Sequence, residues 1–302
     1  MYDLVIIGAG PAGLAAAVYA ARQKINFCVI SEDVGGQTKW SSDVENYLGF
    51  HLVSGAQLTE KFEEHIKDYK IEMKYESIKE IKKKNSNFGV KTNKGDYEAK
   101  TVLIASGKKP RELNVSGEKE FRGRGVTYCA TCDAPLFSGK IVAVVGGGNA
   151  ALDAALLLEK YAKKIYLVTI NDAMQGERAM LEKVSKSKKI EVITKSSTKE
   201  VKGSKFVKSI IIETNRKQKE LSVEGVFIEI GSIPSVDFDK LTEKNKWNEI
   251  VIHSKEYISN QTSVPGIFAA GDVTDVPEKQ IIVAAGEGVK AVLGVFKWLG
   301  KK

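Results

Sequence analysis

The chain has 302 residues, of which 43% are hydrophobic and 28% are charged, as in a globular protein long enough for two ordinary domains. Three cysteines are too few for a disulfide framework, and no run of about 18 apolar residues or secretory signal is evident, so we expect a cytoplasmic protein without a membrane span. The net charge of +8 comes without a zinc finger, a helix-turn-helix or an aromatic RNA-binding motif, which favours acidic protein partners over nucleic acid.

The first elements predict a dinucleotide site. An apolar strand at residues 4–7 runs into Gly8-Ala9-Gly10-Pro11-Ala12-Gly13 and then into an Ala-rich helix that ends near Arg22. Glycines here permit a tight turn and let a pyrophosphate approach the N–H groups at the helix N-terminus. A second strand, residues 26–30, ends before Ser31 and Glu32. Glu32 lies 19 residues past Gly13, where an acid reaches an adenosine ribose.

The next hundred residues are less regular. Gly36-Gln37 and the segment with Asn46 lie in a region with little periodic pattern. A helix is expected from Ser54, with apolar residues on one face, followed by alternating strands over residues 71–97. The buried strand 102–105, which includes Ala105, enters a turn at Gly107. Residues 108–111 then break the pattern and are interpreted as an inter-domain crossing.

The segment Tyr128-Cys129-Ala130-Thr131-Cys132-Asp133 holds a Cys-x-x-Cys pair with an acid directly behind it. Such a pair exchanges electrons readily when one sulfur is held as thiolate. The same spacing also serves as half of a zinc site or as a passive staple. A four-ligand zinc site is disfavoured because Cys28, in the apolar run 27–30, is the only other cysteine and is expected to be a small buried hydrophobe.

The opening motif returns at residues 141–151. Adding 138 to the first copy maps Gly8 to Gly146, Gly10 to Gly148 and Gly13 to Ala151 without a gap. An internal duplication of a dinucleotide-binding unit explains this match. The two copies indicate either two nucleotide sites or one site and a retained scaffold.

The second copy departs from the first at the ribose position. The same offset places Thr169 and Ile170 where NAD recognition normally has a carboxylate. Residues 171–176 carry no arginine for the 2′-phosphate of NADPH, and Arg178 is the first basic residue available.

The last third completes the two units. Strands are expected at residues 189–194, 207–213 and 225–230, with a return crossing at 231–234. The apolar strand 267–270 delivers Gly271 and Asp272, the latter placed to bind a sugar or ribitol hydroxyl. The final helix, roughly 280–299, starts with small residues that allow a ligand near its N-terminus.

Seven motifs recur in order along the chain: GAGPAG from Gly8, GGQ from Gly35, VENY from Val44, YCATCDA from Tyr128, VVGGGNAALDAA from Val144, IFAAGDV from Ile267 and KQIIVAAGEG from Lys279. Together they resemble the low-molecular-weight flavin thioredoxin reductases and the C-terminal part of the alkyl hydroperoxide reductase flavoprotein subunit. The resemblance implies an α/β fold of two Rossmann-like three-layer domains, usually in a homodimer. Residues 1–111 and 233–302 would form an FAD domain, into which a pyridine-nucleotide-like domain, 112–232, is inserted.

The resemblance also implies roles for individual residues. Cys132 would face the flavin, and Cys129 would attack the disulfide of a thioredoxin-like protein. Asp133 would move a proton, or alternatively cap a helix. Ala134 stands where the family usually has glycine. FAD is expected along a set of residues from both chain ends, with the last two at the flavin end: Gly8, Gly10, Pro11, Ala12, Gly13, Ser31, Glu32, Gly36, Gln37, Asn46, Ala105, Gly107, Gly271, Asp272, Gln280 and Ile281.

The electron donor is where the chain departs from the family. NADPH-dependent members carry a His-Arg-Arg type cluster where this chain has Thr169-Ile170-Asn171. The chain therefore resembles the ferredoxin-dependent flavin thioredoxin reductases, and a charge of +8 suits an acidic ferredoxin. NAD(P)H is the alternative donor, because the Gly146–Gly148 turn is intact. The alternative substrate is a peroxiredoxin-type carrier, and the alternative function is a flavin-bound sensor without turnover. Trp40 or Trp298 is expected either to cover the flavin or to pack in the core.

Overall fold

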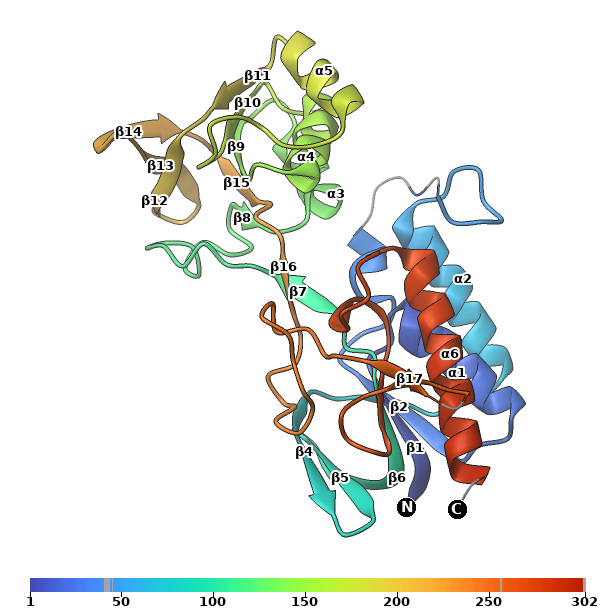
Figure 1. Ribbon diagram of the computed structural model, residues 1–302. Coiled ribbons are helices and arrows are strands. Elements are labelled where there is room, and N and C mark those ends of the chain that lie inside the picture. Colours follow the sequence, from blue (N-terminus) through green and yellow to red (C-terminus); the bar gives the residue numbers. More distant parts are fainter. Residues whose placement is uncertain (41–43, 45, 256, 301–302) are drawn as a thin grey trace. The chain divides into compact units, whose positions relative to one another are not determined.

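The computed structural model describes residues 1–40, 44, 46–255 and 257–300. The chain divides into two compact units, each considered by itself. Unit 1 comprises Met1–Lys109 and Ile233–Lys302, and unit 2 comprises Pro110–Ser232 (Figure 1). The two crossing segments are the short strands β7 (Lys108–Pro110) and β16 (Ser232–Pro234), which pair with each other.

Unit 1 is built on a nine-stranded sheet in which β17-β18-β19-β6-β1-β2-β3 are neighbours and the hairpin β4–β5 is attached to β6. Its strands are β1 (Tyr2–Ile7), β2 (Phe27–Ser31), β3 (Met73–Tyr75), β4 (Ile78–Lys84), β5 (Asn87–Thr92), β6 (Asp96–Ile104), β17 (His253–Lys255), β18 (Ile258–Gln261) and β19 (Ile267–Ala269). Its helices are α1 (Pro11–Arg22), α2 (Gly55–Asp68), α6 (Ile281–Gly300) and the short 3-10 turns η1 (Gly36–Trp40) and η3 (Gly271–Val273).

Alternation along the strands of unit 1 builds two cores. Leu4 and Ile6 of β1 face α1 and α6, which lie side by side with α2 on one face of the sheet (Figure 1). Val5 and Ile7 point to the other face, toward the β4–β5 hairpin. Cys28 belongs to that second core and has no exposed surface, which confirms it as a buried small hydrophobe.

Unit 2 is built on a five-stranded parallel sheet in the order β11-β10-β9-β15-β8, with a three-stranded antiparallel sheet, β12-β13-β14. Its strands are β8 (Val126–Thr127), β9 (Ile141–Val145), β10 (Lys164–Val168), β11 (Ile190–Ile193), β12 (Ser196–Gly203), β13 (Val207–Thr214), β14 (Lys217–Ser222) and β15 (Gly225–Ile228). Its helices are α3 (Ala130–Asp133), the 3-10 turn η2 (Ala134–Phe137), α4 (Asn149–Glu159) and α5 (Arg178–Lys186).

The sequence-based expectation for unit 2 lacks several strands, β12 and β14 among them. In β14 Leu221 is the buried residue and the other five are exposed, so the segment lacks the apolar alternation that marks a strand. It is extended because β13 supplies the backbone partners, with Ile210 paired to Leu221. Strand pairing, a long-range interaction, here overrides local pattern.

The duplication extends to individual hydrogen bonds. In unit 1 Leu4 is in register with Phe27, and 138 residues later Val142 is in register with Ile165. The Gly8 N–H donates to the Ile30 carbonyl at 2.8 Å, and the Gly146 N–H donates to the Val168 carbonyl at 2.9 Å. Both copies therefore hold the strand-to-helix turn in the same way.

Among the described residues, no helix is both long and apolar enough to cross a bilayer.

The contact between α1 and α6 gives a stability prediction. A Cβ on Gly288 would lie 1.9 Å from the backbone carbonyl oxygen of Ala12, whereas one on Gly286, in the same helix, would meet nothing within 4 Å. Gly288→Ala should lower the free energy of unfolding by about 1–3 kcal/mol through overpacking. Gly286→Ala, the matched control, should raise it by about 0.5–1 kcal/mol. Urea unfolding of both variants measures this, and equal effects would contradict the packing described.

Candidate cofactor cavity and redox disulfide

A cavity in unit 1 gathers segments from both ends of the chain. It opens over the Gly8–Gly10 turn, and the end of β2, residues 105–108 after β6 and the start of α6 contribute further walls. Most residues that were predicted to bind a cofactor line it: Gly8, Gly10, Pro11, Ala12, Ser31, Gly36, Gln37, Ala105, Gly107, Gly271, Asp272, Gln280 and Ile281. Lining residues that were not among the predicted cofactor-binding residues are Ala9, Asp33, Thr38, Ser106, Lys108, Ala270, Lys279 and Ala284.

The glycine turn explains why this cavity suits a pyrophosphate. Gly8 has φ +103°, and a Cβ there would lie 2.3 Å from the Ala105 carbonyl oxygen. Gly10 is the N-cap of α1 and has no side chain to cap it, so the first helical N–H groups are directed at the cavity. These features fit FAD, whose isoalloxazine would supply two-electron chemistry when bound.

Three predicted residues do not line the cavity. Gly13 packs instead, because a Cβ on it would lie 1.9 Å from the Gly8 carbonyl oxygen. Glu32 accepts a hydrogen bond from the Ser77 hydroxyl and lines an adjoining pocket that shares Gly8, Ser31, Asp33 and Ser106 with this cavity. Asn46 donates to Gln280 Oε1 at 3.0 Å and so contacts the lining indirectly.

Two lysines of the cavity wall pair with an acid that no motif indicated. Glu249 Oε1 lies 3.1 Å from Lys108 Nζ and 3.2 Å from Lys279 Nζ. All three side chains are largely buried. Burial raises the pKa of Glu249, but hydrogen bonds from Asn245 and the two lysines outweigh it and lower this pKa below its ordinary value. Burial raises the pKa of Asp272, while Lys279 and Lys108 lower it. The two lysines thus favour the ionised form of the carboxylate expected to bind the ribitol.

The structure bears on the aromatic candidate Trp298 and on the zinc alternative. Trp298 is partly buried against the core of unit 1, which agrees with a packing role. The Trp40 side chain lies outside what the structure describes, as does Glu45 of the VENY motif. Within the described ranges, no three His, Cys, Asp or Glu side chains gather as metal ligands.

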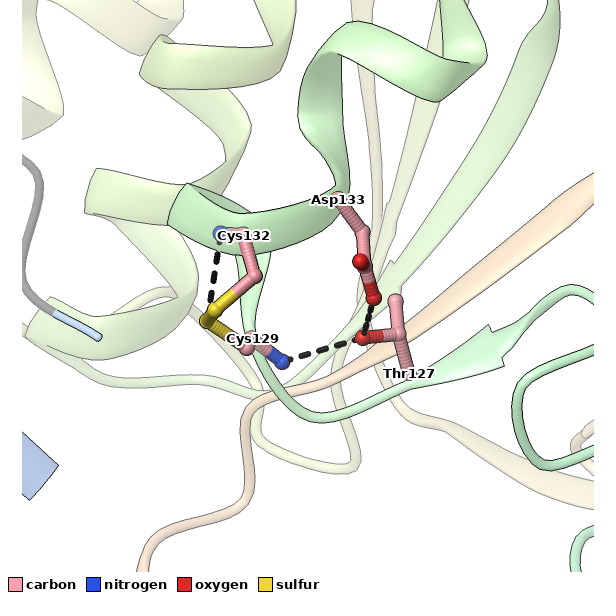
Figure 2. The surroundings of a disulfide bond; sticks show 4 residues. All are labelled: Thr127, Cys129, Cys132 and Asp133. Carbon is pink, nitrogen blue, oxygen red and sulfur yellow. Dashed lines mark hydrogen bonds between the residues drawn. A yellow bond between two sulfur atoms is a disulfide. The ribbon is translucent and has the colours of Figure 1, made fainter. Parts of the chain in front are cut away.

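In unit 2 Cys129 and Cys132 form a disulfide at the start of α3 (Figure 2). Cys129 is the N-cap of this helix, and the Cys132 N–H donates to Cys129 Sγ at 3.1 Å. The Cys129 N–H donates to Thr127 Oγ1 at 3.1 Å, and Thr127 Oγ1 in turn donates to the Asp133 carboxylate. N–H groups directed at a sulfur favour its thiolate form.

Asp133 was expected either to move protons or to cap a helix. It stands at the N-cap position of η2, but its side chain makes no capping hydrogen bond there. Its carboxylate instead accepts from Thr127, as Figure 2 shows, and this link ties it to the backbone of Cys129. The geometry is therefore compatible with a role in proton transfer at the sulfur pair.

A second carboxyl group near the disulfide was not indicated by any motif. Glu229 follows β15, and burial raises its pKa to about 8. The charge of Asp153, on α4, also raises the pKa, and a hydrogen bond from the Ala130 N–H lowers it. Ala130 lies between the two cysteines, so Glu229 touches the redox segment itself.

The second glycine turn retains its geometry, but its ribose position is apolar. Gly148 is the uncapped N-cap of α4, as Gly10 is of α1. Ile170 is 74% exposed at the position where an acid or a cation would hold a ribose. Lys195, which the sequence did not indicate, lies at this loop. Its Nζ pairs with Asp172 Oδ1 at 3.5 Å. Arg178 pairs with Glu182 at 3.0 Å.

A duplicated α/β fold with a cofactor cavity in one unit and a redox-type disulfide in the other defines a flavin-dependent disulfide oxidoreductase. The chain belongs to the pyridine nucleotide-disulphide oxidoreductase family, whose model matches residues 2–288. This confirms the predicted family, the enzyme class and, with the structures below, the two-domain dinucleotide-binding fold.

Relatives and solved structures agree with this assignment. The chain is 39% identical to the F subunit of alkyl hydroperoxide reductase from Pseudomonas putida over 99% of its residues, but spans 58% of that relative. It is 37% identical to a thioredoxin reductase of Ureaplasma parvum, covering 97% of this chain and 95% of the relative. Lactococcus lactis thioredoxin reductase matches with a TM-score of 0.91 at 30% identity over 100% of both chains. A ferredoxin-flavin thioredoxin reductase from Clostridium acetobutylicum matches with a TM-score of 0.54 at 34% identity, over 100% of this chain and 99% of that one.

The raised pKa of Glu229 predicts a pH effect on stability. The folded protein keeps this proton up to about pH 8, whereas the unfolded chain loses it near the ordinary value of 4.5, so the stability it contributes is lost as pH rises between these values. Glu229→Gln removes the titration. When the pH is raised from 5 to 9, we expect the free energy of unfolding of the variant to rise by about 1–2 kcal/mol relative to that of wild type. Urea unfolding at both pH values measures this, and a pH-independent difference would refute it.

Proposed function

We propose that this protein is a thioredoxin reductase-type enzyme that passes an electron pair from bound FAD to the Cys129–Cys132 disulfide and on to a thioredoxin-like protein. Two-electron reduction breaks the S–S bond and leaves two thiols. Cys129 then attacks the substrate disulfide, and Cys132 resolves the mixed disulfide, which re-forms the Cys129–Cys132 bond and releases the substrate as a dithiol. Asp133, linked to Cys129 through Thr127, moves the proton that this exchange requires. The observation that carries the proposal is the Cys-x-x-Cys disulfide at a helix start in a chain whose other unit holds a dinucleotide cavity.

The site residues take parts that match their surroundings. The uncapped start of α1 would receive the pyrophosphate, and Asp272 would accept a hydrogen bond from the ribitol. Gln280 and Ile281, where α6 begins, would hold the flavin end. The Cys132 N–H, 3.1 Å from Cys129 Sγ, stabilises negative charge on the attacking sulfur. We further propose that the protein acts as a homodimer, as its resemblance implies.

An acidic iron-sulfur protein such as ferredoxin is the donor that we favour. Exposed Ile170 offers no clamp for a ribose or a 2′-phosphate, and the cations Lys195 and Arg178 are already paired with acids. Unit 2 holds 21 cationic and 15 acidic residues, a net charge of +6, against +2 for unit 1 with 25 and 23. This excess speeds the encounter with an acidic protein. The similarity to a ferredoxin-flavin thioredoxin reductase supports the same choice.

A nucleotide-dependent reductase is the second candidate. The turn at Gly146–Gly148 keeps both its backbone conformation and its uncapped helix start, which a discarded nucleotide site does not need. The similarity to an alkyl hydroperoxide reductase suggests that such an enzyme would serve a peroxide-removing system. In that case a small peroxiredoxin-type carrier replaces thioredoxin as the substrate.

Substitution of the proposed nucleophile tests the route of the electrons. Cys129→Ser should retain FAD with an unchanged visible spectrum and lose thioredoxin reduction to background, because the sulfur that attacks the substrate is gone. Cys28→Ser is the matched control. That thiol is buried in unit 1, so the variant should keep its reductase activity. Substantial reductase activity in Cys129→Ser would remove this residue from the mechanism.

A parallel assay decides the donor. Purified protein is given thioredoxin disulfide with chemically reduced ferredoxin, NADPH or NADH at equal concentration. We expect ferredoxin to support turnover, and NADPH to be weaker by about tenfold or more, because a charge-assisted contact to the 2′-phosphate is missing. Rapid bleaching of the flavin by low NADPH would favour the second candidate. FAD binding without turnover from any donor would instead indicate a redox sensor.

A further inference from the structure

The two copies of the duplicated unit carry different residues at the strand end that closes the glycine turn. In unit 1 the Ala105 N–H donates to the Ile7 carbonyl at 2.7 Å, and in unit 2 the Glu229 N–H donates to the Val145 carbonyl at the same distance. The carbonyl oxygens of Ala105 and Glu229 also close the glycine turns in the same way. A Cβ on Gly8 would lie 2.3 Å from the first, and one on Gly146 would lie 2.2 Å from the second. Unit 2 thus has a carboxyl group where unit 1 has a methyl group.

The sheet register brings this carboxyl group to the redox pair. Strands β15 and β8 are parallel neighbours, with Val226 beside Val126 and Phe227 beside Thr127. Glu229 and Cys129 each follow two residues after the last of these pairs, at the carboxyl end of a sheet whose paired strands lie about 5 Å apart. The hydrogen bond from the Ala130 N–H to Glu229 agrees with this placement.

The Ala130 N–H belongs to the first residue of α3, whose N-cap is Cys129. N–H groups at a helix start stabilise a thiolate there, and a nearby carboxylate destabilises it. We propose that Glu229 is a positioning residue that controls how readily the Cys129–Cys132 disulfide is reduced, by holding the Ala130 N–H and by placing a titratable carboxyl beside the sulfurs. This inference rests on the proposed role of the pair in electron transfer.

The neighbouring charged groups define when Glu229 acts. The charge of Asp153, on α4, favours the neutral form of Glu229. Cys129, Cys132 and Asp133 belong to the neighbouring segment 129–133, which includes α3. Because burial also keeps Glu229 protonated up to about pH 8, it is neutral near pH 6 and ionised at pH 9. Its charge therefore opposes thiolate formation only in alkaline solution.

Dithiothreitol equilibration of the FAD-bound protein tests this. The reaction breaks the Cys129–Cys132 bond and forms the ring disulfide of dithiothreitol, with two electrons and two protons passing to the protein sulfurs; a sulfur that stays ionised releases its proton to solvent. We expect Glu229→Gln to favour the reduced protein by about tenfold over wild type at pH 9, with no change at pH 6. Glu229→Ala, which also frees the Ala130 N–H, should favour reduction at both pH values.

The control is Glu224→Gln, which removes a carboxylate at the opposite end of the same strand, where Glu224 Oε2 accepts from the Ile141 N–H at 3.4 Å. This variant should match wild type at both pH values. As a second readout, iodoacetamide should alkylate the reduced Glu229→Gln variant at a rate that begins to increase at a lower pH than it does for wild type.

Superimposable equilibria for wild type and Glu229→Gln at pH 9, or an equal shift in Glu224→Gln, would overturn the proposal. Neither measurement uses thioredoxin or an electron-donor protein. A failure here therefore leaves the proposed reductase activity standing, and a failure of that activity leaves these equilibria measurable.

Discussion

The close approach of backbone to backbone at the two glycine turns is the constraint on which the rest of the structure depends. At Gly8 and Gly146 the chain leaves a buried strand with a positive φ and passes against a neighbouring strand end too closely for any Cβ. A helix then starts without a side-chain cap, so its first N–H groups are available to an anion. The turn positions the cavity in unit 1 and the corresponding strand ends in unit 2.

The duplicated units have diverged in chemistry while keeping this geometry. In unit 1 small residues surround the turn, and Lys108 and Lys279 of the cavity wall both pair with the largely buried Glu249. In unit 2 the equivalent strand end carries Glu229, the ribose position carries Ile170, and the neighbouring strand leads into the disulfide. Unit 1 thus has the surroundings of a cofactor site, and unit 2 has those of a thiol site.

The excess of positive charge follows the same division. Unit 2 has a net charge of +6 in 123 residues, against +2 in the larger unit 1. Surface charge affects the rate of encounter more than the affinity of the complex. The unit that holds the redox disulfide therefore also carries most of the excess positive charge.

The sequence by itself determined the glycine turns, the duplication, the Cys-x-x-Cys pair and most residues that line the cavity. These features depend on short spacings, and local backbone geometry leaves few alternatives at a strand–glycine–helix junction. The tertiary structure alone decided that Glu249 joins Lys108 and Lys279, that Asp33 lines the cavity, and that Glu229 contacts the disulfide segment. It also decided that β12 and β14 are strands. Each of these results from pairing or packing between residues distant in the chain, or from the direction of one side chain, and local periodicity carries no information about either.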